Sequence, residues 1–82
     1  MVRVYVGAGR VAGMRPQDFV GAITGEANIE GRDIGAIQIA DRYSLVEIRE
    51  DLVDRVIEAL QGSTIKGHEV QVRRDKGGPG PQ

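Results

Sequence analysis

Apolar and polar residues alternate in four short stretches of the chain, and each alternation predicts a β-strand with one buried face. In the first stretch, the apolar Val2, Val4 and Val6 alternate with Arg3 and Tyr5. The same pattern recurs at residues 34–40, 43–49 and 70–73. We therefore expect four strands, each turning its valines and isoleucines toward a core and its polar residues away from it.

Two other segments carry apolar residues at spacings of three and four, which predicts an amphipathic helix in each. The first begins at Pro16, a residue suited to the first helical turn, and ends near Gly25. Its apolar side is formed by Phe19, Val20 and Ile23. The second begins at residue 50 and stops at Gly62. Its apolar side is formed by Leu52, Val53, Val56, Ile57 and Leu60.

The predicted order of elements is therefore β-α-β-β-α-β. Asp41 and Arg42 form a tight connection, so the second and third strands should pair as an antiparallel hairpin. Two split βαβ units then give an α+β, ferredoxin-like fold, in which a four-stranded antiparallel sheet carries both helices on one face. The opposite face of the sheet should remain open to solvent.

Length and composition set limits on this picture. The chain has 82 residues, enough for one small domain, which we place at residues 1–76. Residues 77–82 contain only Gly, Pro and Gln, and we expect this tail to be disordered. The glycine-rich segment at residues 7–13 is expected to be a flexible loop. The absence of Cys excludes disulfides and Cys-based metal sites, and no apolar run approaches the ~18 residues that span a membrane.

Charge becomes informative only through its distribution. The net charge is −1, which by itself does not point to a nucleic acid. Four acidic residues gather on the predicted second helix, at positions 50, 51, 54 and 58, whereas arginines and both tyrosines of the chain, Tyr5 and Tyr43, fall on or beside the open sheet face. Aromatic rings on a sheet surrounded by arginines are typical of a platform on which nucleobases stack.

Several sequence motifs resemble a known family of RNA-binding domains. Residues 4–9 (VYVGAG) and 41–48 (DRYSLVEI) resemble the first-strand and third-strand motifs of RNA-recognition motif (RRM) domains. A more specific resemblance, over residues 2–74, is to the C-terminal RNA-binding domain of bacterial DEAD-box RNA helicases of the DbpA and CsdA/DeaD type. That resemblance is carried, in order, by residues 19–23 (FVGAI), 30–37 (EGRDIGAI), 43–48 (YSLVEI) and 65–67 (IKG).

The resemblance implies a function. In this family the domain is attached to an ATP-dependent helicase core and docks that core onto structured RNA, typically a ribosomal RNA hairpin, with roles in ribosome assembly and cold adaptation. The chain contains neither a G-x-x-x-x-G-K-[ST] loop nor an Asp-Glu-Ala-Asp sequence. We therefore expect a binding domain of a cytoplasmic helicase, without catalysis or a cofactor of its own, since ATP and Mg²⁺ belong to the helicase core. Neither DNA nor a membrane is expected as a partner.

The resemblance also assigns candidate binding residues. The family's stacking positions fall on Tyr5, Tyr43 and Leu45, and the last is usually aromatic. Leucine packs against a base but does not stack with it, so a stacking contribution of ~1–3 kcal/mol to RNA binding is lost. More of the binding free energy is then expected from the arginines. The predicted RNA-binding residues are Arg3, Tyr5, Arg10, Arg15, Arg42, Tyr43, Leu45, Arg49, Arg73 and Arg74.

Two other functions are compatible with a ferredoxin-like fold. One is a protein-docking module without RNA affinity, in which the tyrosines are ordinary strand residues. The other is an acylphosphatase-like hydrolase, because residues 9–15 (GRVAGMR) resemble a phosphate-binding loop. That enzyme needs an Asn on the second strand to orient water, and the one Asn here, Asn28, precedes that strand.

Overall fold

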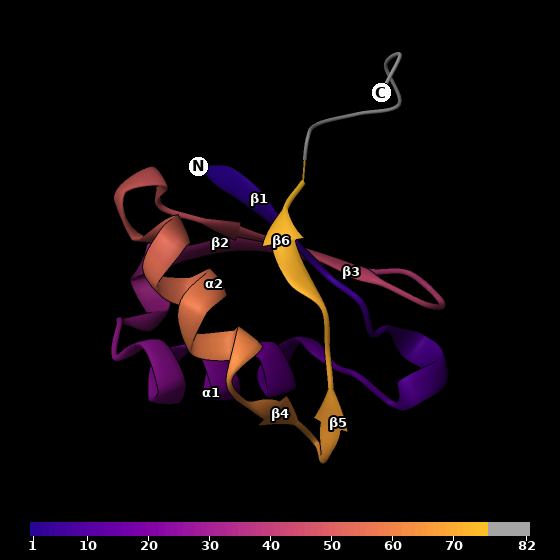
Figure 1. Cartoon of the computed structure of the whole chain (residues 1–82). Helices are drawn as coiled ribbons and strands as arrows, with labels where there is room; N and C mark the ends of the chain where they lie inside the picture. The colour runs from indigo at the N-terminus through magenta and orange to yellow at the C-terminus, as the bar shows by residue number, and fades with distance from the viewer. Residues whose placement is uncertain (76–82) are drawn as a thin grey trace.

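The computed structural model describes residues 1–75, and the predicted tail at 77–82 lies outside the described residues. No helix within this part is long and apolar enough to cross a lipid bilayer. The elements, in order (Figure 1), are β1 (Val2–Val6), α1 (Pro16–Ala27), β2 (Ile34–Ile39), β3 (Ser44–Ile48), α2 (Val53–Gln61), β4 (Thr64–Ile65), β5 (His68–Glu69) and β6 (Val72–Arg74).

Four of the strands form one sheet in the order β2-β3-β1-β6, and every neighbouring pair is antiparallel. Strand β1 lies inside the sheet, where Tyr5 pairs with Leu45 of β3 on one side and with Arg73 of β6 on the other. The predicted α+β architecture with a four-stranded antiparallel sheet is thus confirmed. Both helices cover the same face of the sheet, and the other face is left open (Figure 1).

The core lies between the sheet and the two helices. Side chains from both helices and from the inner face of the strands are at most 1% exposed and belong to one cluster. Burying each of them stabilises the fold by about 1.5–3 kcal/mol. The inward residues predicted from the sequence occupy these positions, among them Val4, Val6, Phe19, Ile23, Val46, Ile48, Val56 and Leu60.

The first helix is longer than the sequence predicts. It begins at Pro16 as expected, passes through Gly25 and ends at Ala27. Asn28 follows in the left-handed conformation, with φ 57° and ψ 48°. Asn is one of the few residues other than glycine that adopts this conformation readily, so it replaces the predicted glycine as the helix stop.

A small hairpin, which the alternating pattern does not predict, precedes the last strand. Strands β4 and β5 pair through Thr64–Glu69 and Ile65–His68. The connecting Lys66 and Gly67 both have positive φ angles, 52° and 80°, as a tight hairpin turn requires. The hairpin brings His68 close to the loop that follows β1.

The glycine-rich loop after β1 is held in place by the turn between β2 and β3. It contains a short 3-10 turn, Arg10–Ala12. The backbone N–H of Arg10 donates to the carbonyl oxygen of Ala40 at 2.8 Å, and that of Val11 donates to Asp41 at 2.9 Å. The expected flexible loop is therefore a packed segment with defined backbone partners.

Two further contacts fix this loop. Ser44 is fully buried, and its hydroxyl donates to the carbonyl oxygen of Ala8 at 2.7 Å. At Gly9 the two segments touch so closely that an added Cβ would lie 2.2 Å from the carbonyl oxygen of Ala40 and 2.8 Å from the backbone of Tyr43. Glycine is required here by the approach of backbone to backbone.

We predict that Gly9→Ala destabilises the protein by about 3 kcal/mol, because the added methyl group meets backbone atoms that cannot rotate away. Urea denaturation measures the change. Gly25→Ala is the matched control: its Cβ meets no atom within 4 Å, and in a helix interior it should stabilise by about 0.5–1 kcal/mol. An unchanged urea midpoint for Gly9→Ala would show that the loop is not packed as described.

Candidate nucleic-acid interface

The open face of the sheet carries a stack of three side chains. Tyr5 stands at the middle of β1, and Tyr43 lies immediately before β3. Their ring centroids are 5.7 Å apart and the ring planes are inclined by 15°, so the two rings are stacked. The guanidinium carbon of Arg73 lies 4.2 Å from the centre of the Tyr5 ring, a cation–π contact.

These contacts reach Tyr5 from opposite sides, because β3 and β6 flank β1 on opposite edges. The stacked pair contributes about 0.5–1.5 kcal/mol, and the cation–π contact about 0.5–1 kcal/mol. Tyr43 is the more exposed of the two tyrosines, at 42%. The two predicted tyrosines and Arg73 therefore lie together in one continuous stack, in which Tyr43 is the outer ring.

Leu45 extends the apolar part of this face. It lies directly across from Tyr5 in the register of β1 and β3, and across from Gln38 in β2. It is half-buried, so the side chain supports the stack from the neighbouring strand and offers little free surface.

The end of the sheet away from Tyr43 carries negative charge. Glu47 pairs with Arg3 across β3 and β1. Its carboxylate accepts a hydrogen bond from the backbone N–H of Ala36 at 3.1 Å, where the pairing of β2 is irregular. The position of this carboxylate makes this end of the face unfavourable for phosphate.

Four of the predicted arginines are engaged with carboxylates. The carboxylates that pair with them belong to loops, to a chain end and to the start of α2. The sequence pattern did not predict these pairs. The pairs, with N–O distances, are Arg3–Asp75 at 3.5 Å, Arg10–Asp41 at 3.3 Å, Arg49–Asp33 at 3.4 Å, Arg49–Asp51 at 3.3 Å and Arg74–Asp54 at 3.2 Å.

The other predicted arginines, Arg15, Arg42 and Arg73, make no ion pair with any residue in the described range 1–75. Arg42 is exposed beside Tyr43, and Arg73 lies over Tyr5. Arg15 is apart from them, at the beginning of α1. Two of the three arginines without an ion pair in this range, Arg42 and Arg73, thus lie next to the two tyrosines.

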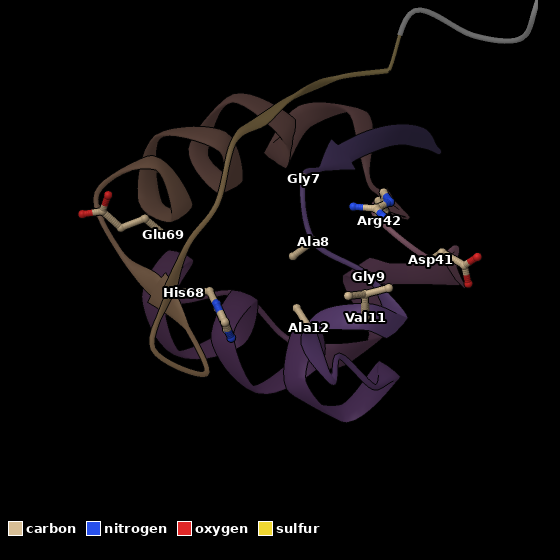
Figure 2. A pocket seen from close by; sticks show the side chains of 9 residues that line it. All are labelled: Gly7, Ala8, Gly9, Val11, Ala12, Asp41, Arg42, His68 and Glu69. Atoms are coloured by element: carbon tan, nitrogen blue, oxygen red, sulfur yellow. The ribbon is translucent and has the colours of Figure 1, made fainter.

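An open cleft of about 340 Å³ lies beside Arg42 at this same end (Figure 2). Three segments far apart in the sequence form its walls, and for this reason the sequence pattern assigned no role to its residues other than Arg42. The lining residues are Gly7, Ala8, Gly9, Val11, Ala12, Asp41, Arg42, His68 and Glu69.

The residues that a phosphate-loop hydrolase or a metal site would need do not lie together. Arg15 and Asn28, on which a phosphate-loop hydrolase would depend, flank opposite ends of the 12-residue helix α1, about 18 Å apart along its axis. Within residues 1–75, no group of three or more His, Cys, Asp or Glu side chains is arranged to hold a metal ion. The arrangement is that of a binding surface: an exposed ring, flanking cations and an adjacent cleft.

Comparison with known proteins gives relatives over most of the chain. The chain is 36% identical over 73 residues to the ATP-dependent RNA helicase DbpA of Escherichia coli, an alignment that covers 89% of this chain and 16% of that protein. It is 31% identical over 74 residues to DbpA of Bacillus subtilis, with coverage of 90% and 15%. The chain therefore spans about one sixth of the length of these relatives.

Structural comparison agrees on the fold. A crystal structure described as RNA Binding Protein PG1 superposes with a TM-score of 0.71 and 18% sequence identity, covering 96% of this chain and 99% of that one. The family model described as the DbpA RNA-binding domain matches residues 3–74, nearly the whole of the described structure. The chain belongs to the DbpA RNA-binding domain family.

Proposed function

We propose that this chain is an RNA-binding module that anchors an ATP-dependent DEAD-box RNA helicase to structured RNA, in particular to a ribosomal RNA hairpin. Family membership and the helicase names of the curated relatives support the proposal. In such a protein, ATP and Mg²⁺ would act in the helicase core, and this domain would provide the attachment to RNA in the cytoplasm.

The topology supports an RRM-like, ferredoxin-like assignment. The order β2-β3-β1-β6 places β1 and β3 at the centre of the sheet. Helix α1 connects β1 to the edge strand β2, and α2 lies between β3 and the other edge strand, β6. Two interlocked split βαβ units produce this arrangement.

The observation that carries the proposal is the stack of Tyr5, Tyr43 and Arg73 on an open sheet face. The exposed ring of Tyr43 can accept any of the four bases, since each has a π face. Arg42, next to Tyr43 in the chain, and Arg73, on the other side of Tyr5, would contact phosphates of the bound RNA.

Structured RNA fits this surface better than a plain single strand. Because Tyr5 is engaged by Arg73 and by Tyr43, the stack would receive one base, on Tyr43. One stacked base contributes only ~1–3 kcal/mol, so further affinity must come from phosphate contacts spread over a defined shape. A folded hairpin presents phosphates in such a fixed arrangement.

The protein-docking function remains the second candidate, since the exposed Val11 and Tyr43 would also suit a protein partner. The three predicted arginines that have no carboxylate partner in the described residues, Arg15, Arg42 and Arg73, favour RNA over it.

A titration separates the two. We expect a labelled large-subunit ribosomal RNA hairpin to bind more tightly than an unstructured strand of equal length, with affinity falling as salt rises. Fluorescence anisotropy at two salt concentrations measures both. Equal, weak binding of the two RNAs would refute anchoring to structured RNA. No binding of either RNA to the folded domain would favour protein docking.

We predict that Tyr43→Ala weakens hairpin binding about tenfold or more, because it removes the stacking surface. Anisotropy measures affinity, and thermal unfolding should show that the variant remains folded, since Tyr43 is 42% exposed. Tyr43→Phe keeps the ring and should bind like the unaltered protein. If Tyr43→Ala binds the hairpin with full affinity, the ring has no stacking role.

We also predict that Arg42→Ala and Arg49→Ala differ, although both remove one positive charge. Arg42 makes no ion pair within residues 1–75, so its loss should lower the slope of log K against log salt by about 0.7–0.9, the value of one phosphate contact. Arg49 is held by Asp33 and Asp51, and its loss should change the slope less. Equal slopes for the two variants would show that ion pairing does not select the arginines that bind.

A further inference from the structure

We propose that the cleft beside Arg42 is a pocket for a second, unpaired nucleobase of the bound RNA, adjacent to the base on Tyr43. The inference rests on the proposed function and names a second binding site of the same surface. It assigns a role to His68, Val11 and Ala12, which the stack does not use.

The cleft is formed before any ligand arrives. One wall is the loop after β1, which is fixed to the turn between β2 and β3 by the hydrogen bonds Arg10–Ala40 and Val11–Asp41. The buried hydroxyl of Ser44 holds the same loop from below. A pocket whose backbone is already held loses little conformational entropy on binding.

Size and polarity suit a flat heterocycle. The volume of about 340 Å³ equals that of about eleven water molecules at ~30 Å³ each, which accommodates a purine or pyrimidine ring with room for the sugar. Apolar side chains of Ala8, Val11 and Ala12 line the cleft. Val11 is 73% exposed, so it contributes almost nothing to the core and offers its surface to a ligand.

The ionisable side chains are arranged for a nucleotide. His68 lies on one side of the cleft and Arg42 on the opposite side (Figure 2). The carboxylates of Asp41 and Glu69 point away from the interior (Figure 2). A planar ring with hydrogen-bonding nitrogens on one wall and a cation on the other complements a base and its phosphate.

Because the cleft lies next to Tyr43, the nucleotide that enters it would be the neighbour of the one stacked on Tyr43. Arg42 lines the cleft and directly precedes Tyr43 in the chain. Two successive unpaired nucleotides would place one base on the Tyr43 ring and the next in the cleft, with the phosphate between them at Arg42. Loops and bulges of a folded RNA supply such splayed bases, whereas a paired stem does not.

Nuclear magnetic resonance of the whole chain bound to the ribosomal RNA hairpin tests this inference. His68 is the one histidine in the sequence, so its ring protons report on the cleft without ambiguity. We expect nuclear Overhauser contacts from base protons to the His68 ring and to the Val11 methyl groups. A bound hairpin that contacts Tyr43 and gives no such contacts would overturn the pocket and leave the proposed function intact. A hairpin that does not bind would overturn both.

Variants of His68 test what holds the base. We expect His68→Ala to weaken hairpin binding about fivefold, because a stacking wall is lost, and His68→Phe to restore most of the affinity by keeping a planar ring. His68 is exposed, so thermal unfolding of both variants should match that of the unaltered protein. Equal affinities of the Ala and Phe variants would overturn the role of the ring.

Discussion

Strand β1 is hydrogen-bonded along both edges, and this constraint determines which side chains meet the core and which meet a ligand. Because side chains alternate across a strand, Val4 and Val6 are buried and Tyr5 is delivered to the open face. The same pairing sets Arg73 and Leu45 on either side of Tyr5. A shift of one residue in the pairing of β1 would turn its buried side chains to the open face and its exposed side chains to the core. Folding and RNA binding therefore both require the same register.

A backbone contact connects this sheet to the rest of the interface. Gly9 lets the loop after β1 touch the backbone at Ala40 and Tyr43. That contact fixes the position from which the Tyr43 ring reaches Tyr5, and it also forms one wall of the cleft. The aromatic stack and the cleft are therefore two parts of one rigid end of the molecule, while the opposite end carries the negative charge of Glu47 and an Arg3 that is paired with Asp75.

The local part of this structure could be predicted from the sequence. Alternation and helical spacing act within a few residues, so they predicted the order of elements, the buried side chains and the outward direction of Tyr5 and Arg73. The hairpin of β4 and β5 was missed because its strands have two residues each, too short for a pattern, and its turn is Lys66-Gly67 where Asn-Gly would be the strong signal. Features that join distant segments were also missed. The ion pair Arg3–Asp75 and the diagonal stack of Tyr43 on Tyr5 exist only once the strand register is set.

The composition of the stack has an optical consequence. The chain has no Trp, its two tyrosines lie against each other on the open face, and its single Phe, Phe19, is sealed in the core. All tyrosine absorption and tyrosine fluorescence of the chain therefore come from the surface that we assign to RNA. With the rings 5.7 Å apart, excitation passes readily between them, so a molecule that quenches one ring dims both. The protein carries its own fluorescent reporter of occupancy, and no label need be attached to it.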